Sequence, residues 1–329
     1  MNRYAKITGT GSFLPETVLT NSDLEKMVDT SDEWIRQRTG IVERRIAEDD
    51  IATSDLSIHA ARLAIKRAQV DPLDIQMILV ATVTPDTFFP STACYVQKGI
   101  GAKNASAMDI SAACAGFLYG LDLANGLIVS GQYDTILVVG AEVFNNIVDW
   151  NDRNTCVLFG DGAGAAVVQS TEEEKGIIAS YIGSDGDYAD IDLLGIPAGG
   201  SRMPVTSDAI DNNLNKIQMN GREVFKLGVR LMPEAAERVL KKANVSVDDV
   251  DMLIPHQANL RIIEAVGHRL GVPRDKVYVN VDKYGNTSAA TVIIALDEAI
   301  REGSVKPDDL VLLVTFGAGL TWGSTLLRL

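Results

Sequence analysis

One cysteine stands where a nucleophile could work. Cys114 lies in the stretch DISAACAGFLYG, residues 109–120, among alanines, glycines and apolar residues. The chain has three cysteines, Cys94, Cys114 and Cys156, at wide spacing and without a CxxC pair, so we expect neither a disulfide framework nor a zinc site. A buried cysteine is commonly just a small hydrophobic side chain. A catalytic role for Cys114 therefore needs support from residues that handle protons.

His256 is the histidine best placed to assist such a nucleophile. The chain has three histidines, and His59 and His268 lie inside or near the end of helical patterns, where structural or surface roles are usual. His256 follows the predicted strand DMLIP, and strand carboxyl ends are where α/β sheets present ligand-binding groups. In the internal repeat described below its counterpart is Ala81, so the fold itself does not require an imidazole there.

Asn286 is the third candidate for the chemistry. It belongs to YGNTSAAT, residues 284–291, which in the repeat occupies the helix-opening position that SAACAGF holds in the first half. An asparagine before Thr and Ser can also be only a helix cap. A pseudo-twofold relation between the halves would place Cys114, His256 and Asn286 around one cavity. If Cys114 opens a buried helix, backbone N–H groups and the helix dipole should lower its pKa and favour the thiolate.

An internal repeat organises the elements that must position these residues. Residues 64–81 align without gaps on residues 239–256 at an offset of 175. The same offset carries ILVVG, residues 136–140, onto VLLVT, residues 311–315. The two halves of the chain are therefore predicted to share one fold.

A second pair of similar segments marks where the halves differ. FGDGAGAAVV, from Phe159, matches FGAGLTWGST, from Phe316, at the smaller offset of 157. The difference predicts an insertion in the first half around residues 143–158, between strands that adjoin directly in the second half. We divide the chain into an N-terminal half, 1–171, with the cysteine, and a C-terminal half, 172–329, with the histidine and asparagine.

Helix and strand patterns alternate within each half. Polar caps followed by helical spacing predict a helix over 53–69, and the apolar run MILVATV predicts a strand at 77–83. We then expect a helix near 91–101, a strand leading to Ile110, a helix from about Cys114 to Ser130, and a strand at 135–143. Such alternation predicts mostly parallel sheets.

The helix after Cys114 is predicted to lie at the centre of the molecule. It carries glycines and alanines on several faces and only one charge, so water should touch little of it. Two helix-flanked sheets around such a central layer would stack as five layers, αβαβα. This α/β arrangement resembles the thiolase-like fold.

Composition excludes several classes of function. The chain has 329 residues, 46% of them hydrophobic, which is enough for one large or two ordinary domains. Its formal charge of -14 opposes attraction to nucleic acid or to anionic membranes. The N-terminal stretch, MNRYAKITGTGSFLP, lacks the apolar segment of a signal peptide. No apolar run in the chain approaches the ~20 residues that span a bilayer. We expect a soluble cytoplasmic protein.

Several segments resemble the active-site blocks of the beta-ketoacyl-acyl carrier protein synthase III family. They are DISAACAGF, PHQANLRII, GNTSAA and FGAGLTWGS, and TSDEWIRQRTGI and FGDGAGAAVV extend the resemblance along essentially the whole chain. The resemblance implies an initiating condensing enzyme of type II fatty acid synthesis. It implies a homodimer, acyl-CoA and acyl carrier protein as partners, and no metal or cofactor beyond the coenzyme A thioester that serves as substrate.

The resemblance also implies roles for the candidate residues. Cys114 would attack a short acyl-CoA, often acetyl-CoA, to give an acyl-enzyme. Malonyl-acyl carrier protein would then lose carbon dioxide, with His256 and Asn286 stabilising the enolate, and the carbanion would attack the acyl-cysteine. The acyl carbonyl oxygen would bind the backbone N–H groups of Cys114 and Ala318, where many relatives have glycine in place of Ala318.

Binding residues follow from the same resemblance. Trp34 and Arg153 match positions that sandwich the adenine of coenzyme A, and Arg38 matches a basic residue near its phosphates. Phe89 matches a residue that lines the acyl tunnel at the dimer interface. The Gly- and Pro-rich loop 196–213 would cover the acyl site and be mobile. Residues matching the docking surface for acyl carrier protein are Lys226, Gln257, Ala258, Asn259, Leu260 and Arg261.

Alternatives remain at this point. Degradative thiolases use a second catalytic cysteine late in the chain, and none follows Cys156. Elongating synthases place a second histidine where this chain has Asn286. A papain-type hydrolase shares the order Cys, His, Asn, but its C-G-[SA]-C-[WY] signature is absent. A polyketide or secondary-metabolite starter synthase with another primer, and an inactive scaffold homologue, stay open.

Overall fold

Two mixed sheets form the framework of the computed structural model, which describes residues 3–329. The first sheet has the order β1 (Tyr4–Phe13), β7 (Gly162–Thr171), β6 (Thr135–Glu142), β4 (Met77–Ala81), β5 (Ser106–Ile110). The second has the order β11 (Met252–Pro255), β12 (Leu310–Gly317), β13 (Thr321–Arg328), β8 (Gly176–Ser184). Each sheet therefore draws its strands from one half of the chain.

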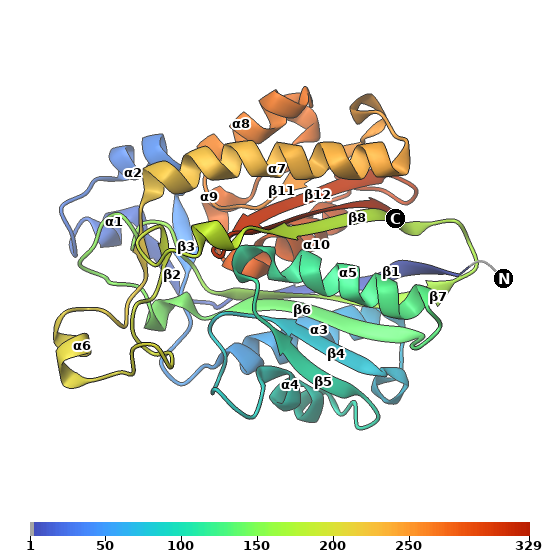
Figure 1. Cartoon of the computed structure of the whole chain (residues 1–329), viewed down its shortest axis with the longest axis horizontal. Helices are drawn as coiled ribbons and strands as arrows, with labels where there is room; N and C mark the ends of the chain where they lie inside the picture. The colour runs from blue at the N-terminus through green and yellow to red at the C-terminus, as the bar shows by residue number, and fades with distance from the viewer. Residues whose placement is uncertain (1–2) are drawn as a thin grey trace.

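Three helical layers enclose the two sheets (Figure 1). The outer layer on the first sheet is α3 (Thr53–Ala68) and α4 (Thr92–Ile100), and that on the second sheet is α7 (Gly221–Ala243) and α8 (Leu260–Leu270). The layer between the sheets is α5 (Gly116–Val129) and α10 (Thr291–Arg301). The stack reads αβαβα, which confirms the predicted five layers.

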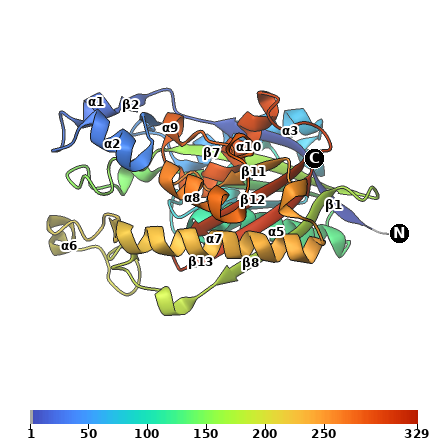
Figure 2. The ribbon, with the colours of Figure 1, turned by 90° about the horizontal axis from the view of Figure 1, so that it is seen from above.

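Smaller elements surround this stack. On one side lie β2 (Val18–Thr20), α1 (Asn21–Leu24), α2 (Asp32–Thr39), β3 (Glu43–Arg45) and α9 (Val281–Tyr284). The segment between β8 and α7 forms β9 (Leu194–Gly195), α6 (Ser207–Asp211) and β10 (Gln218–Met219). Both groups gather at the end of the stack where α6 stands out in Figures 1 and 2.

The prediction of mostly parallel sheets is wrong. In the first sheet β4 pairs in parallel with β5 and β6, but β7 is antiparallel to both β6 and β1. The second sheet repeats this pattern, because β12 is parallel to β11 and antiparallel to β13, and β13 is antiparallel to β8. The reason is that β7 and β13 return directly after β6 and β12 without a crossover helix, and such a return is antiparallel.

The backbone reproduces the offset of 175 seen in the sequence. The strands β6 and β12 start and end at positions 175 apart, and so do the 3₁₀ turns η2 (Ala113–Ala115) and η7 (Ser288–Ala290). Even a strained conformation is repeated, because Ala113 has φ 45° and Ser288 has φ 50°. Positive φ is costly for a residue with a side chain, so its presence in both halves indicates a shared architectural need.

The predicted insertion is also confirmed. In the second half three residues, 318–320, connect β12 to β13, whereas residues 143–161 connect β6 to β7 in the first half. The longer connection includes the 3₁₀ turn η3 (Phe144–Asn146). It reaches the mouth of the cavity described below, so the extra residues serve the site rather than the sheet.

The central helix starts later than predicted. We expected a helix from about Cys114, but η2 holds Cys114 and α5 begins at Gly116, because the positive φ of Ala113 turns the chain before the helix. The first half of α5 is buried as expected, and its far end reaches the surface at Leu123, Gly126 and Val129.

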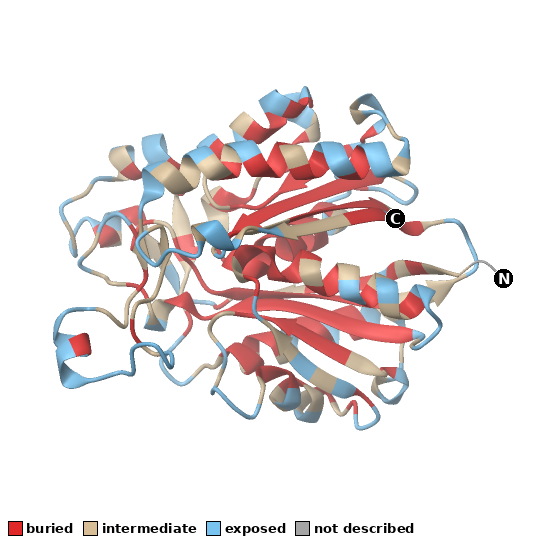
Figure 3. Cartoon of the chain, viewed as in Figure 1, coloured by how far each residue is buried: buried red, intermediate tan, exposed pale blue. Residues whose placement is uncertain are grey.

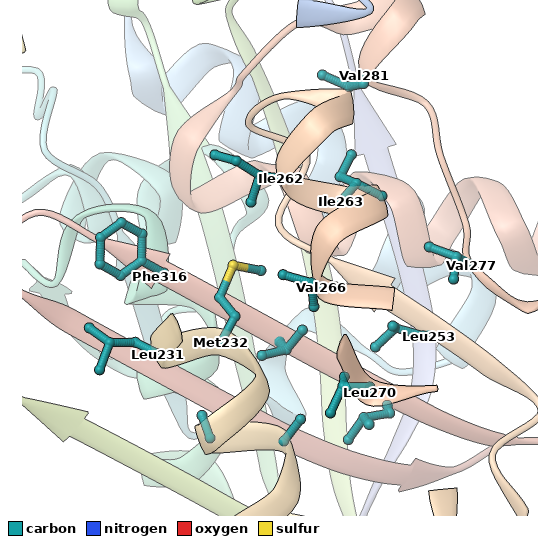
Figure 4. Close-up of a cluster of buried hydrophobic side chains, with 14 of the residues drawn as sticks. Leu231, Met232, Leu253, Ile262, Ile263, Val266, Leu270, Val277, Val281 and Phe316 are labelled. Carbon is teal, nitrogen blue, oxygen red and sulfur yellow. The ribbon is translucent and has the colours of Figure 1, made fainter. Parts of the chain in front are cut away.

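Apolar side chains fill the spaces between the layers (Figure 3). All residues of β6 and β12 are buried, as expected for strands covered on both faces. In the second half α7 runs across β12 and β13 (Figure 2), and Met232 of α7, Ile262 of α8 and Phe316 of β12 belong to one cluster (Figure 4). This cluster fixes the outer helices against the strand that ends at the cavity.

Glycines in β1 allow α3 to lie directly on the sheet, and this predicts a stability effect. A Cβ atom on Gly9 would lie 2.4 Å from Ala64 O and 2.5 Å from Ala68 N, both in the backbone of α3. We expect Gly9→Ala to lower the free energy of unfolding by roughly 1–3 kcal/mol because the helix must shift. The measurement is urea denaturation followed by circular dichroism.

The matched control is Gly126→Ala in the exposed part of α5. No atom lies within 4 Å of a Cβ there, so alanine should raise the free energy of unfolding by roughly 0.5–1 kcal/mol through helix propensity. Equal stability changes in the two variants would contradict the close packing of β1 and α3.

Candidate active site

One cavity gathers the three residues predicted to do chemistry. Cys114, His256 and Asn286 all line a cavity of about 950 Å³. Cys114 comes from η2 in the first half, whereas His256 follows β11 and Asn286 precedes η7 in the second. The turns η2 and η7 are in contact, so the central layer brings the halves together at this point. The same cavity reaches residues at the surface, which connects the sulfur to solvent.

The Cys114 sulfur is held on a tight turn against β12. A Cβ atom on Gly317 would lie only 2.6 Å from the Cys114 nitrogen and 3.2 Å from the Ala115 nitrogen. Only glycine permits this approach of strand and turn. The end of β12 therefore sets the position of the nucleophile within the cavity.

Burial dominates the acidity of the thiol. Cys114 is 8% exposed, and burial raises the pKa of its thiol to about 12, while a hydrogen bond with Ser288 acts in the opposite direction. This corrects the expectation that the helix start would lower that pKa, because desolvation of the anion exceeds the stabilising contacts. The resting residue is a thiol, and attack requires a group that takes its proton.

His256 is a neutral imidazole held by Thr291. Its ring is buried, and burial lowers the pKa of His256 to about 3. The Thr291 hydroxyl lies 2.6 Å from Nδ1 and 2.9 Å from Ser288 O, and it can donate its one proton to either. The backbone nitrogen of His256 donates to Val314 O of β12 at 2.8 Å, which fixes the residue at the end of the sheet.

Asn286 has a fixed orientation. Its Oδ1 accepts a hydrogen bond from the backbone nitrogen of Ser288 at 2.9 Å, which is the capping interaction weighed from the sequence. Because the carbonyl side of the amide is used, the Nδ2 donors remain for a group in the cavity. Capping and a role in the site are therefore compatible. Backbone hydrogen bonds with Leu158 and Gly160 hold Asn286 to the first half.

Ala318 lines the cavity next to Gly317 and keeps an ordinary backbone. Among residues 3–329 the non-glycine residues with positive φ do not include Ala318. Alanine is therefore compatible with position 318, where many members of the family that this sequence resembles have glycine. Two backbone N–H groups, those of Cys114 and Ala318, lie on the adjoining turn and strand end.

The sequence analysis missed three polar residues at the centre of the molecule. Thr291 lies against His256, and Ser288 donates to the buried carboxylate of Glu142. Glu142 ends the strand β6, and a carboxylate at the carboxyl end of an apolar strand was a signal for a functional group. Ser288 and Thr291 lie within or beside the quoted GNTSAA block, but nothing local indicated their partners.

Aromatic and cationic groups form the mouth of the cavity. The guanidinium of Arg153 lies 5.2 Å from the centre of the Trp34 ring, and that of Arg38 lies 5.8 Å from it. All three residues line the cavity. Arg153 is also held by a 2.8 Å hydrogen bond to Asp29 O. The structure thus brings together the three residues that the resemblance assigned to coenzyme A.

Phe89 and the tip of the loop 196–213 lie away from the cavity lining. Phe89 is 86% exposed and is not part of the cavity lining. The segments at the base of the loop contribute Leu194, Ile196 and Ile217 to the lining, whereas α6 stands at the edge of the molecule (Figure 1). The cover over the cavity is therefore the base of this loop rather than its tip.

The residues assigned to carrier protein docking differ in how far they are exposed. Gln257 is 1% exposed and binds Pro255 O, Tyr278 O and the backbone nitrogen of Asn280, so its side chain is a structural bridge and its docking assignment is wrong. Ala258, Asn259 and Leu260 are partly buried at the start of α8. Asn259 caps that helix through Arg261 N and donates to Arg38 O, beside the mouth of the cavity.

Two cationic residues remain on the surface near the cavity. Arg261 is exposed, and its guanidinium lies 5.4 Å from the centre of the Phe225 ring. Lys226 is exposed and pairs with Glu223 at 2.7 Å. Part of the lysine charge is therefore neutralised locally, whereas the arginine presents its charge over an apolar surface.

Residues 3–329 hold no cluster of three or more His, Cys, Asp and Glu side chains arranged to bind a metal ion. No helix in that range is long and apolar enough to cross a bilayer.

The sequence of the chain is similar to that of one family of proteins. The family model described as 3-oxoacyl-[acyl-carrier-protein] synthase III matches residues 108–186, and the model of its C-terminal part matches residues 240–329. A beta-ketoacyl-[acyl-carrier-protein] synthase III from Caldanaerobacter subterraneus is 57% identical over 98% of this chain and 97% of its own length. One from Clostridioides difficile is 52% identical over 100% of this chain and 99% of its own length.

Solved structures agree with the sequence comparison. The crystal structure of 3-oxoacyl-[acyl-carrier-protein] synthase III from Aquifex aeolicus matches with a TM-score of 0.91 and 49% identity, covering 99% of this chain and 100% of that one. A priming beta-ketosynthase from the R1128 polyketide pathway matches with a TM-score of 0.91 at 36% identity, covering 100% and 97%.

The burial of His256 predicts that its imidazole stays neutral at working pH. Its pKa of about 3 in the folded chain lies below the ordinary value of 6.5, so only the unfolded chain takes up a proton as the pH falls below 6.5. We expect the ring nitrogen resonances of His256 to stay constant between pH 8 and 5 in NMR of histidine-labelled protein. His256→Ala identifies the signal, and a midpoint between pH 6 and 7 would contradict the burial argument.

Proposed function

The chain belongs to the 3-oxoacyl-[acyl-carrier-protein] synthase III family, and we propose that it moves a short acyl group from coenzyme A to Cys114 and condenses it with malonyl-acyl carrier protein. It is an acyltransferase that initiates fatty acid synthesis. The observation that carries these residue assignments is the single cavity that joins Cys114, His256 and Asn286. The proposed reaction uses no cofactor, because coenzyme A enters as the thioester substrate. The proposed location is the cytoplasm.

Cys114 performs the first half-reaction. Its sulfur attacks the thioester carbonyl of acyl-CoA, with acetyl-CoA as the proposed primer, and coenzyme A leaves as the free thiol. Negative charge develops on the carbonyl oxygen, and the backbone N–H groups of Cys114 and Ala318 are the proposed donors. The close approach at Gly317 supports this pairing of turn and strand end. Donors of this kind are worth about 3 kcal/mol each in the transition state.

His256 and Asn286 serve the second half-reaction. Malonyl-acyl carrier protein loses carbon dioxide, and its thioester oxygen becomes an enolate that needs donors. Asn286 offers Nδ2, because Ser288 N already binds its Oδ1. His256 offers Nε2–H when Thr291 donates to Nδ1. The carbanion attacks the acyl-cysteine carbonyl, and 3-ketoacyl-acyl carrier protein leaves as Cys114 is released.

Trp34, Arg153 and Arg38 bind coenzyme A in this proposal. A flat indole and a guanidinium suit the two faces of an adenine ring, and Arg38 offers positive charge to phosphates. At 5.2 Å the Arg153 guanidinium contacts the Trp34 ring directly. A purine can enter between them only after Arg153 moves outward.

Acyl carrier protein docks beside this mouth. Arg261 and Lys226 supply positive charge to an acidic partner, although the chain as a whole carries -14. Arg261 forms no ion pair within residues 3–329, whereas Lys226 forms an ion pair with Glu223. Complementary charge mainly speeds and orients the encounter. Arg261 is therefore the stronger contributor of the two.

A homodimer forms through the edge of the first sheet in this proposal. Strand β5 ends that sheet with one unpaired side, and Met108 on β5 is exposed. The exposed Phe88 and Phe89 precede α4, whose first residues bind Asp109 of β5. A twofold axis would pair the two β5 strands and bury these apolar groups. It would also bring Phe89 to the acyl tunnel of the other copy.

A priming synthase of polyketide type is the second candidate function, favoured by the likeness to the R1128 enzyme at 36% identity. The two candidate functions use the same proposed catalytic residues and differ in the acyl group of the primer. Steady-state comparison of acetyl-, isobutyryl- and longer acyl-CoA with malonyl-acyl carrier protein decides between them. A clear preference for a longer primer would replace acetyl-CoA in the proposal.

The division of labour in the cavity predicts that one substitution separates the half-reactions. Cys114→Ser should abolish release of coenzyme A from acetyl-CoA, because the hydroxyl is a much weaker nucleophile at this site. Carbon dioxide release from labelled malonyl-acyl carrier protein should remain measurable, because His256 and Asn286 are intact. His256→Ala provides the reverse comparison. Loss of both activities to the same degree in Cys114→Ser would refute the division.

The dimer proposal predicts a change of assembly from one edge substitution. Met108→Lys places a charge where the two β5 strands would meet, so the variant should sediment as a monomer while the unmodified chain sediments as a dimer. Leu123→Lys, on the exposed face of α5, is the control and should leave the dimer intact. A monomeric unmodified chain at micromolar concentration would end this part of the proposal.

A further inference from the structure

Arg44 is a buried cation without a salt bridge. It is 0% exposed, and none of the ion pairs among residues 3–329 includes it. Burial lowers the pKa of its guanidinium to about 10, so the group keeps its charge at neutral pH. Its Nε is also buried and has no hydrogen-bond partner. A buried charge is costly unless its surroundings compensate for it, so the retention of this one points to a task beyond packing.

The Arg44 guanidinium binds one side of the cavity mouth. Its Nη1 donates to Asn21 Oδ1 at 2.9 Å and to Leu19 O at 3.2 Å. Asn21 Nδ2 donates in turn to Asp32 Oδ1 and to Ile41 O, both at 2.8 Å. Asp32 is the first residue of α2, and Ile41 lies just beyond its end. Both ends of α2, the helix that presents the indole of the mouth, are therefore connected to Arg44.

The same guanidinium binds the other side of the mouth. Its Nη2 donates to Val157 O at 2.8 Å. Val157 follows a compact turn in which Thr155 N and Cys156 N both donate to Asp152 O, at 3.1 and 3.0 Å. Arg153 belongs to that turn, and its guanidinium lies 5.2 Å from the centre of the indole. One buried group therefore holds both backbone segments that meet at the mouth.

The surroundings leave Arg44 little freedom to move. It lies on β3, where it pairs with Leu19 of β2. A Cβ on Gly160 would lie 3.1 Å from Arg44 Cβ, and one on Gly285 would lie 3.3 Å from it. Arg44 does not line the cavity. It can therefore act on a ligand only through the segments that it holds.

We propose that Arg44 is a positioning residue that fixes the spacing of Trp34 and Arg153 and so controls binding of the nucleotide part of acyl-CoA. A purine enters only after the Arg153 side chain moves outward, and that side chain must then close on the second face of the base. Closure requires the two backbone segments to stay in place while the side chain moves. A planar guanidinium suits this task, because its donors point in fixed directions toward both segments at once. The proposal rests on the proposed function, in which this mouth binds coenzyme A.

The test compares two acyl donors that differ only in the phosphorylated nucleotide. Acetyl-CoA carries it and acetyl-pantetheine lacks it, and kcat/KM is measured for each with labelled malonyl-acyl carrier protein. Arg44→Met keeps an unbranched side chain without its donors. In this variant the ratio of the acetyl-CoA value to the acetyl-pantetheine value should fall about tenfold, comparable to the loss of one cation–π contact. A change in the folded fraction or in the reaction of Cys114 affects both donors alike and leaves this ratio unchanged.

A double-mutant cycle shows whether Arg44 acts through the mouth. Trp34→Ala alone should lower the ratio. Adding Arg44→Met to it should lower the ratio little further, because the spacing no longer matters once the indole is gone. If the two fold-changes multiply, Arg44 acts elsewhere and the proposal is overturned. An unchanged ratio in Trp34→Ala would instead count against the proposed function, since the nucleotide would then bind at another place.

Arg67→Met is the matched control. Arg67 also donates to a backbone carbonyl, Thr10 O, and it pairs with the buried Asp297, but these contacts join β1 and α10 rather than the two sides of the mouth. This variant should lose stability and keep the ratio of the unmodified chain. A fall in its ratio as large as that in Arg44→Met would show a general effect of losing an arginine and would overturn the proposal.

Arg44→Lys separates charge from geometry. An ammonium keeps the charge but cannot reproduce the planar set of donors, so the ratio should fall in this variant as well. It also carries the test if Arg44→Met does not fold. A ratio equal to that of the unmodified chain in either folded variant would overturn the positioning role. Failure of both variants to fold would overturn it too, because Arg44 would then serve the whole fold.

Discussion

The contact between the turns η2 and η7 at the centre of the molecule is the constraint on which the site depends. Each turn precedes a central helix and contains one residue with positive φ, Ala113 or Ser288. Glycines in the flanking strands let the backbones meet, because a Cβ on Gly140 would lie 2.5 Å from Ala289 O and one on Gly317 would lie 2.6 Å from Cys114 N. The two halves of the chain therefore place their functional groups by backbone contact, which side-chain motion cannot loosen.

Burial at this contact decides the electrostatics of the cavity. The thiol of Cys114, the imidazole of His256 and the carboxyl of Glu142 are all shifted toward their neutral forms by desolvation. Hydrogen bonds from fixed backbone and hydroxyl donors partly offset that shift for Glu142. A site built in this way holds little charge at rest, and its donors are ready for the charge that develops during reaction.

Much of the architecture was predictable because the repeat is local in sequence, whereas the errors concern contacts between distant residues. The offset of 175, the insertion after β6 and the gathering of Cys114, His256 and Asn286 could be predicted from strand ends and helix starts. The antiparallel returns of β7 and β13 carry no distinct pattern of side chains. Gln257 was misassigned because its inward partners, Tyr278 O and Asn280 N, belong to another segment. The acidity of Cys114 was misjudged because a helix start is visible in sequence and the depth of burial is not.

The direct contact of Arg153 with Trp34 gives the mouth of the cavity a built-in competitor. The guanidinium lies over the indole and is bound to Asp29 O, so it occupies the space that a flat base would need. If the proposed function holds, a purine must displace this arginine, and the apparent affinity for a nucleotide is reduced by the fraction of molecules in which the arginine has moved. A base that stacks on the freed indole would replace the lost contact, whereas an acyl chain alone would not.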